Sequence, residues 1–552
     1  MWKLHAREPG DPEHAPPATG PGGKGQGRDP TANVTRESDR IVVPKKRANN
    51  TRQTAGSRYC DTRKRKGETT VNTNVDLHGA DGVAESVEGR ILTKRNAEQP
   101  LDVPNPESGT QGGGLDRVRN AAQQDKEKQF TALLHHVTPE LLLESFYELN
   151  PKAAVGVDDE TWQEYQKDAE NRTRELHARV HQGTYRAQPS KRIYLPKPDG
   201  RQRPIGIACL EDKIVQAATA KVMGAIYEED FLGFSYGFRP GRKQHDALDA
   251  LYVALMQRKV NWVLDADIRG FFDAIDHTWM LQFIQHRIAD KRVQRLIQKW
   301  LTAGISEDGE WSSTTVGTPQ GAVISPLLAN VFLHYVLDLW IDHWRRHHAK
   351  GDVVVVRYAD DFVIGFQYRE DAERCLQALR ARMTQFGLEL HPDKTRLIEF
   401  GRFAATNRQA RGQGKPETFN FLGFTHICGR RRTGSFVIKR RSIAKRMRAK
   451  LQEVKQKLRK KINASIAEQG AWLRAVVQGW YNYHAVPGNR RALDEFRTQV
   501  SRMWRKLLQR RSHKARTKWS WTRMNRHIRR WLPSVRILHP HPDARWAVTH
   551  SR

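Results

Sequence analysis

The clearest hydrophobic pattern in the chain is a pair of short apolar runs around residue 360. Val353 to Val356 precedes Tyr358-Ala359-Asp360-Asp361, and Phe362 to Phe366 follows it. β-branched and aromatic runs of this length predict two strands, so the residues between them are predicted to form a tight hairpin with two carboxylates at its tip. Adjacent carboxylates repel each other, and a rigid turn that holds them needs a compensating cation such as a divalent metal ion. A solvated Asp-Asp turn is the competing interpretation.

A second apolar strand carries further carboxylates. Trp262-Val263-Leu264 leads through Asp265 to Asp267, and the chain then turns at Gly270. Because strand side chains alternate, Asp265 and Asp267 share a face, and their spacing alone does not choose between them. The sequence therefore predicts a carboxylate from this strand beside the Asp360-Asp361 turn.

Apolar spacing predicts further elements from about residue 115 onward. Helices are predicted near 130–141, up to about 258, over 277–303 and over 370–387, and a hairpin over 194–207 turns at Pro-Asp-Gly. Beyond Phe424 one apolar stripe predicts a long helix, with the members Ile443, Met447, Leu451, Val454, Leu458 and Ile462. Together these elements predict an α+β fold.

The charge of the chain points to a polyanionic partner. Lys and Arg number 94 against 61 Asp and Glu, a formal net charge of +33. Between Lys439 and Lys461 Glu453 is the one acid among many basic residues, and Arg502 to Arg530 holds no acid but three Trp residues. A helix face with such a one-sided charge favours a surface that follows phosphates over a merely solvated face.

Composition also limits the location of the protein. Residues 1–115 are rich in Gly, Pro, Thr and Asn, and we expect them to be largely disordered because they offer little apolar surface to bury. The four cysteines form no Cys-x-x-Cys pair, which disfavours a zinc site and fits a reducing compartment. Neither a signal peptide nor a membrane span is predicted, so we expect a cytoplasmic protein.

The carboxylate motifs resemble those of a known family. Asp267, followed after four residues by the aromatic Phe272 and later by Tyr-Ala-Asp-Asp, resembles the palm motifs of reverse transcriptases. More narrowly, the chain resembles the reverse transcriptase/maturases encoded by bacterial group II introns, whose thumb pattern is similar to Gly479-Trp480-Tyr481-Asn482-Tyr483-His484. The resemblance implies a right-hand polymerase, with fingers and an antiparallel palm sheet over 116–430. It also implies that a helical thumb/maturase domain follows over 431–495. After it would come a basic C-terminal nucleic-acid-binding region over 496–552, without an endonuclease domain.

The same resemblance assigns the chemistry. Asp267, Asp360 and Asp361, with the main-chain carbonyl of Ile268, would hold two Mg²⁺ ions, for which Mn²⁺ is a substitute. Lys394 would act as a general acid that protonates the leaving pyrophosphate, although a surface lysine after a turn is an equally good interpretation.

The resemblance also implies a nucleotide site. Lys197 and Arg203 flank the predicted hairpin turn and would clamp the triphosphate. Pro319, Gln320 and Gly321 would lie beneath the nucleotide, where the chain has Gly321-Ala322 in place of a frequent second glycine. Phe272 would exclude a 2′-hydroxyl, with ordinary palm core as the competing interpretation.

The predicted function is that of an RNA-directed DNA polymerase that copies intron RNA into cDNA and assists splicing and mobility of its own group II intron. Its partners would be intron RNA, the DNA target and primer, and deoxynucleoside triphosphates, and a dimer within the ribonucleoprotein is compatible with the resemblance. One alternative is a domesticated reverse transcriptase that works in phage defence, in CRISPR-associated spacer acquisition or in a diversity-generating element. Another alternative is a non-catalytic RNA-binding splicing factor. The predicted RNA-binding residues are Arg441, Lys445, Arg448, Lys455, Arg459, Trp480 and Tyr481.

Overall fold

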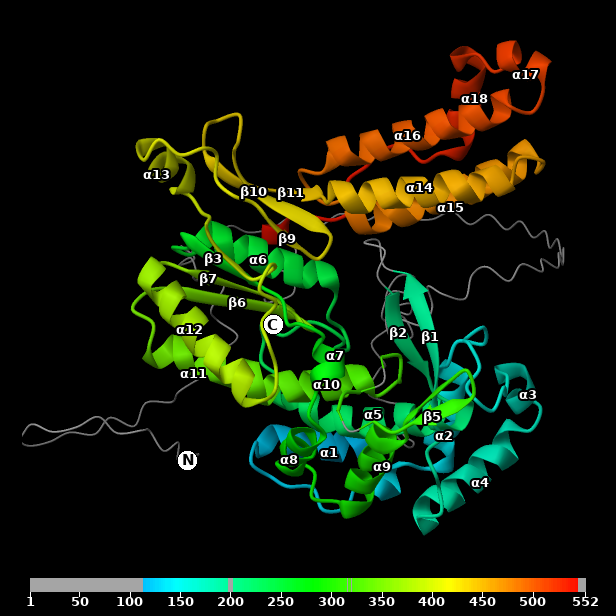
Figure 1. The fold of residues 1–552 in the computed structure, drawn as a ribbon, viewed down its shortest axis with the longest axis vertical. Helices are drawn as coiled ribbons and strands as arrows, with labels where there is room; N and C mark the ends of the chain where they lie inside the picture. The colour runs from blue at the N-terminus through cyan, green and yellow to red at the C-terminus, as the bar shows by residue number, and fades with distance from the viewer. Residues whose placement is uncertain (1–112, 197–201, 315, 319, 545–552) are drawn as a thin grey trace, which may run out of the picture. The chain divides into compact units, whose positions relative to one another are not determined.

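The computed structural model describes residues 113–196, 202–314, 316–318 and 320–544 (Figure 1). Residues 1–112 of the extension predicted to be disordered lie outside the described residues, and so do Lys197 and Pro319. Helix α1 (Gly113–Gln124) begins close to Leu115, where the apolar pattern predicts that order begins.

The N-terminal part of the described chain packs around one long buried helix, α5 (Leu210–Asp230). Side-chain caps set the starts of two neighbouring helices. Thr138 accepts a hydrogen bond from the Leu141 amide, and Thr161 forms a capping box with Glu164. The other helices of this part are α2 (Pro139–Glu148), α3 (Trp162–Gln166) and α4 (Ala169–Gln182), whereas α6 (Gln244–Gln257) packs in a different core.

A small sheet with the strand order β2-β1-β4-β5 adjoins these helices. The predicted hairpin is present as β1 (Ser190–Pro196) and β2 (Gln202–Ile207), paired antiparallel, while its Pro-Asp-Gly turn lies outside the described residues. β4 (Ile305–Glu307) pairs parallel with β1 and antiparallel with β5 (Glu310–Ser312).

The central sheet is antiparallel throughout, with the strand order β6-β7-β3-β8. Its strands are β3 (Trp262–Ala266), β6 (Val353–Tyr358), β7 (Asp361–Phe366) and β8 (Arg396–Glu399). Val353 and Val355 pack into one core with α12 (Arg369–Gln385), whereas Val354 and Val356 pack into another with α6. Burial of both faces explains why the apolar runs are continuous and do not alternate with polar residues.

Further helices lie between β3 and β6 in the chain, and one more follows β8 (Figure 1). The predicted helical block 277–303 is present as two helices, and a π-turn (His334–Asp338) interrupts a later helical stretch. Their bounds are α7 (Phe271–Ala274), α8 (His277–Gln285), α9 (Lys291–Thr302), α10 (Ser325–Leu333), α11 (Leu339–His347) and α13 (Ala404–Ala410).

The C-terminal part is a three-stranded sheet followed by helices around a core of their own. The sheet contains β9 (Phe419–Phe421), β10 (Phe424–Arg430) and β11 (Phe436–Ser442). The helices are α14 (Ala444–Lys460), α15 (Ile466–His484), α16 (Arg490–Gln509), α17 (His513–Lys518) and α18 (Trp521–Trp531). Helix α16 and this core, which runs from Leu451 to Leu532, both continue across the boundary predicted at 495/496, so the structure does not separate the two parts there.

One expectation about the basic segment 439–461 is wrong. Lys439, Arg440 and Arg441 belong to β11 and not to the long helix, and Arg440 is buried in an ion pair with Asp249. The basic helix face therefore begins only with α14. None of the helices in the part of the chain that the structure describes has the length and apolar character to cross a bilayer.

Candidate active site

Three carboxylates meet where the central strands end. Asp360 lies in the turn of the β6–β7 hairpin, and Asp361 begins β7, paired with Tyr358. β3 pairs with β7 so that Ala266 faces Phe362, and Asp267 follows directly after Ala266. The sheet register thus carries Asp267 to the level of Asp361, as the sequence predicts.

Burial and neighbouring negative charges raise the pKa of both carboxylates of the turn. Burial, reinforced by the charges of Asp360 and Asp267, raises the pKa of Asp361 to about 7, although the residue as a whole is exposed at the start of β7. Burial and Asp267 also raise the pKa of Asp360, and Arg203 opposes this effect. Carboxylates crowded in this way favour the binding of a proton or of a cation.

The structure distinguishes Asp267 from Asp265, which the sequence left open. Asp265 lies inside β3, opposite Val363, and pairs with Arg396 at 3.6 Å. Burial raises the pKa of Asp265 to about 6. Asp267 raises the pKa of Asp361 more than Asp265 does, and it also raises the pKa of Asp360. The geometry therefore favours Asp267 as the partner of the turn.

A lysine from the next segment reaches the site. Lys394 Nζ donates to Asp267 Oδ2 at 2.5 Å, so the lysine that the sequence singled out does contact the carboxylate cluster. The His391 amide donates to the Asp267 carbonyl oxygen at 2.7 Å, and Ile268 forms an isolated bridge with Leu390. These backbone bonds fix the segment that carries Lys394 against the end of β3.

The loop before α10 joins two other predicted residues. The Thr318 amide donates to the Phe272 carbonyl oxygen at 2.8 Å, and the Gly206 amide of β2 donates to the Gln320 carbonyl oxygen at 2.7 Å. Gly321 has a φ of 113°, and a Cβ there would lie 2.7 Å from the Gly206 carbonyl oxygen, so the close approach requires glycine. Gln320 and Gly321 are thus held between the strand of Arg203 and the backbone of Phe272, whose half-buried ring packs against Phe271.

The carboxylate oxygens of this site suit a divalent cation, although the three side chains do not surround one common position. Among the described residues, no group of three or more His, Cys, Asp or Glu side chains is arranged closely enough to hold a metal ion. The fit rests on the chemistry of the set, because Asp267, Asp360 and Asp361 offer hard oxygen ligands and destabilise one another without a cation.

Helix α14 and the β9–β10 turn border the site on another side. Arg446 of α14 lowers the pKa of Asp361 through its charge. Tyr483 of α15 donates through its hydroxyl to the Leu422 carbonyl oxygen at 2.8 Å, and its ring lies against Gly423. In the sequence Arg446 is only one basic residue among many, and its place in the first turn of α14 is the feature that could have distinguished it.

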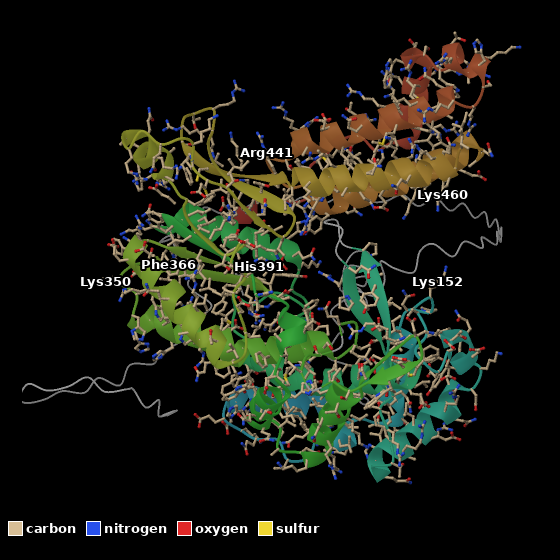
Figure 2. All side chains as sticks on the ribbon, viewed as in Figure 1. Lys152, Lys350, Phe366, His391, Arg441 and Lys460 are labelled. Carbon is tan, nitrogen blue, oxygen red and sulfur yellow. The ribbon has the colours of Figure 1, made fainter. Side chains whose placement is uncertain are left out.

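Four of the predicted RNA-binding residues form a stripe on α14. At about 100° a residue, Lys445, Arg448, Lys455 and Arg459 fall within ~80° of one another, and all four are exposed. Arg441 on β11 and Lys460 at the end of α14 mark the two ends of this region in Figure 2. Lys450 and Lys457 differ from the stripe, because both pair with Glu453.

The predicted RNA contact of Tyr481 is wrong. Tyr481 is 2% exposed and belongs to the core of the C-terminal helices. Trp480 stacks on Phe496 and on His484, with ring centroids 4.5 and 3.8 Å apart. The buried ring of Tyr481 presents no stacking surface for a base, whereas Trp480 is only partly buried and its RNA contact stays a prediction.

Comparisons with known proteins agree with this site. Residues 195–426 match the family model described as reverse transcriptase (RNA-dependent DNA polymerase), and this part of the chain is a reverse transcriptase domain. The resemblance to group II intron-encoded reverse transcriptase/maturases is confirmed by the curated relatives.

Two of these relatives show how far the similarity extends. Protein YkfC of Escherichia coli (strain K12) is 33% identical over 248 residues, 39% of this chain and 64% of that protein. Group II intron-encoded protein LtrA of Lactococcus lactis subsp. cremoris is 33% identical over 234 residues, 41% of this chain and 38% of that protein. The chain thus covers less than two thirds of the length of either relative.

Proposed function

We propose that this chain is an RNA-directed DNA polymerase encoded by a group II intron, which copies the intron RNA into cDNA. The observation that carries the proposal is the meeting of Asp267, Asp360 and Asp361 at adjoining ends of the central strands. In this proposal the central sheet is the palm, the sheet around β1 belongs to the fingers, and the helices from α14 onward form the thumb.

Each residue of the site has a role in this proposal. Asp267, Asp360 and Asp361 would hold two Mg²⁺ ions, or Mn²⁺, with the Ile268 carbonyl completing the set. The bound ions would lower the pKa of the primer 3′-hydroxyl and neutralise the pyrophosphate. Lys394, which already contacts Asp267, would give its proton to the pyrophosphate.

The nucleotide would lie between β2 and the loop before α10. Arg203, whose charge lowers the pKa of Asp360, would bind the triphosphate together with Lys197. Pro319, Gln320 and Gly321 would support the base, and Phe272 would contact the sugar. The primer would lie against the β9–β10 turn.

We also propose that the stripe on α14 binds the intron RNA and so assists splicing. The names of LtrA and of the 91 kDa protein in the cob intron of Schizosaccharomyces pombe, 32% identical over 222 residues, place those relatives in introns. The exposed cations of the stripe, none paired with a carboxylate among the described residues, support a surface for phosphates.

Primer extension tests the polymerase directly. The full chain is given an RNA template, a DNA primer, deoxynucleoside triphosphates and Mg²⁺, and Asp267→Asn is compared with Glu389→Gln. Glu389 is an exposed carboxylate paired with Arg269 close to the same strand end, outside the proposed metal shell. We expect extension by the wild type and by Glu389→Gln and its loss in Asp267→Asn, whereas an inactive wild type or an active Asp267→Asn would refute the proposal.

A further inference from the structure

A buried arginine stands directly behind the Asp360-Asp361 turn. Arg357 is fully buried at the end of an otherwise apolar strand and forms an ion pair with Asp338, which is also fully buried. Its Nε and Nη2 donate to the two oxygens of Asp338 at 2.7 and 2.5 Å. An arginine held this closely by one carboxylate has its remaining donors aimed in fixed directions.

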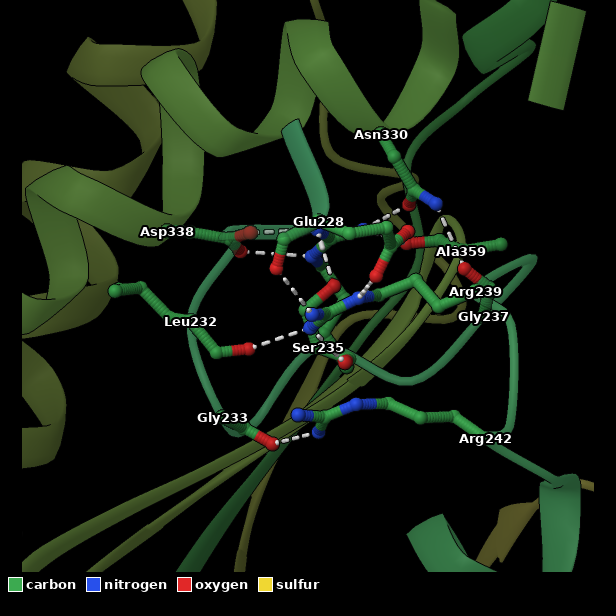
Figure 3. Close-up of polar contacts among 11 residues, drawn as sticks. Glu228, Leu232, Gly233, Ser235, Gly237, Arg239, Arg242, Asn330, Asp338 and Ala359 are labelled. Atoms are coloured by element: carbon green, nitrogen blue, oxygen red, sulfur yellow. Dashed lines mark hydrogen bonds and ion pairs between the residues drawn. The ribbon is translucent and has the colours of Figure 1, made fainter. Parts of the chain in front are cut away.

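The other donors of Arg357 reach the turn itself. Nη1 donates to the Ala359 carbonyl oxygen and to Asn330 Oδ1, both at 3.0 Å, and Nη2 donates to Ser235 Oγ at 2.7 Å. Figure 3 shows these contacts, with Asn330 and Asp338 on the helix side and Ala359 on the turn. One guanidinium thus ties the helix, the segment 232–237 and the turn together.

The π-turn brings the two helical partners of Arg357 into line. Asn330 lies in α10 and Asp338 ends the π-turn that follows it. Eight residues of regular α-helix would place them ~80° apart around the axis, at about 100° a residue. The one additional residue that a π-turn accommodates brings them to within ~20°, so both side chains face Arg357.

The turn has an unusual backbone that needs external support. Ala359 has a φ of 56°, a left-handed conformation that costs free energy for a residue other than glycine. Gly237 lies against it, and a Cβ on Gly237 would come closer to the Ala359 amide nitrogen than real Cβ atoms approach. Asn330 Nδ2 holds Gly237 in place by donating to its carbonyl oxygen at 2.7 Å.

A second buried arginine, Arg239, also holds the segment that carries Gly237. Arg239 donates through Nη1 to the carbonyl oxygens of Leu232 and Ser235, both at 2.9 Å, and pairs with Glu228. The wall behind the turn is therefore built from bonds of defined direction. Apolar residues of equal volume would stabilise a core equally well, so a buried ion pair at this place fixes geometry above all.

We propose that Arg357, Asp338 and Asn330 are positioning residues that hold Ala359 in its left-handed conformation and thereby set the directions of the Asp360 and Asp361 carboxylates toward a divalent cation. The proposal rests on the proposed function, because the cation matters only at a metal-dependent site. None of the three touches the proposed substrate, and they act through the backbone of the turn.

The test compares two arginine-to-lysine variants. Arg357→Lys keeps the charge beside Asp338 but cannot bridge five acceptor atoms in four residues. Arg287→Lys is the matched control, because Arg287 is equally buried, pairs with Asp230 and donates to backbone carbonyl oxygens away from the turn. Asn330→Ala, which leaves the Arg357–Asp338 ion pair intact, is the second variant and covers the case in which Arg357→Lys does not fold.

Three readouts separate positioning from stability. We expect Arg357→Lys and Asn330→Ala to speed hydrogen exchange in the peptide 357–362 and to weaken the binding of Mn²⁺ alone, followed by electron paramagnetic resonance, by ~10-fold or more. Extension should fall with the affinity for the cation, while the KM for the primer–template is unchanged. Arg287→Lys should lower the melting temperature and leave exchange in that peptide and Mn²⁺ binding at wild-type values.

Exchange and Mn²⁺ binding at wild-type values in both folded variants would overturn the proposal, as would equal effects in Arg287→Lys. If the wild type neither binds Mn²⁺ nor extends a primer, the proposed function fails. The exchange of the peptide 357–362 then still decides whether Arg357 and Asn330 hold the turn.

Discussion

At the scale of single residues, the site depends on a glycine that the sequence motifs do not mark. Gly237 leaves no room for a side chain beside Ala359 and Tyr358. In Gly237→Ala the turn has to move by about 1 Å, and a displacement of this size near reacting groups lowers kcat by ~10²-fold. We expect this loss in primer extension, with RNA affinity unchanged in a filter-binding assay.

A second glycine provides the control. Gly224 lies in α5 with nothing near the position of its Cβ, so Gly224→Ala should keep full activity and gain about 0.5–1 kcal/mol of unfolding free energy. Wild-type extension by Gly237→Ala would show that the close contact does not shape the turn.

Phe272 decides a second residue-scale question, the choice of sugar. Its ring is half-buried against Phe271, and its carbonyl oxygen is bonded to the Thr318 amide. If the ring contacts the sugar, Phe272→Val should raise ribonucleotide use relative to deoxynucleotide use on the order of tenfold. The ratio of kcat/KM for the two sugars measures this effect, and a lower melting temperature with an unaltered ratio would identify Phe272 as ordinary core.

The sequence predicted the carboxylates but not what supports them. Asp360 and Asp361 interrupt apolar runs, and a charge in such a place is visible without a structure. Arg357 interrupts the same run, yet its partners Asp338 and Asn330 lie on a distant helix, and a single sequence does not reveal that pairing. Tyr481 shows the opposite error, because an aromatic residue in a basic region looks like a binding residue until its burial is known.

At the scale of elements, helix α14 presents two kinds of lysine. Lys455 and Arg459 belong to the exposed stripe, whereas Lys450 and Lys457 pair with Glu453. Each phosphate contact contributes about −0.7 to −0.9 to the slope of log K against log salt concentration. Replacing Lys455 and Arg459 with Gln should therefore flatten the slope for intron RNA by ~1.4–1.8.

The paired lysines serve as the control on the same helix. Lys450→Gln with Lys457→Gln removes the same charge, but these cations are already neutralised by Glu453, so the slope should change less. Equal slopes in the two double variants would mean that the stripe is a solvated face and not an RNA-binding surface.

The junction between the small C-terminal sheet and α15 should be sensitive to acid. Burial lowers the pKa of His426 and of His484 to about 3, from an ordinary value of 6.5. A histidine that is neutral in the folded state contributes its full stability above pH 6.5 and loses it as the pH falls toward 3. We expect the free energy of unfolding to fall between pH 7.5 and 5.5, and His426→Leu to reduce this loss by ~1 kcal/mol in urea titrations. If His426→Leu loses as much unfolding free energy between pH 7.5 and 5.5 as the wild type, His426 is not a source of the acid sensitivity.

Elements were predicted better than their boundaries. Continuous apolar runs gave β3, β6 and β7, and helical periodicity gave α12 and α14. The limits of the basic segment were missed, since charge density does not distinguish the strand β11 from the helix that follows. The π-turn has no sequence pattern of its own, because it differs from an α-helix by one residue held in place by tertiary contacts.

At the scale of the whole molecule, the reverse transcriptase domain over 195–426 is followed by helices with a separate core. The proposed catalytic carboxylates lie in the first part and the basic stripe in the second. The two activities that we propose, polymerisation and intron RNA binding, should therefore be separable by mutation.

The most direct test of this account is primer extension by Asp361→Ala, measured beside the affinity of the same preparation for intron RNA. The variant removes one of the proposed cation ligands, and the loss of several kcal/mol of transition-state stabilisation should lower extension at least ~10³-fold. RNA affinity and splicing assistance should stay within twofold of the wild type, on the order of experimental error. Extension near the wild-type rate by Asp361→Ala would contradict the central claim that these carboxylates form the polymerase site.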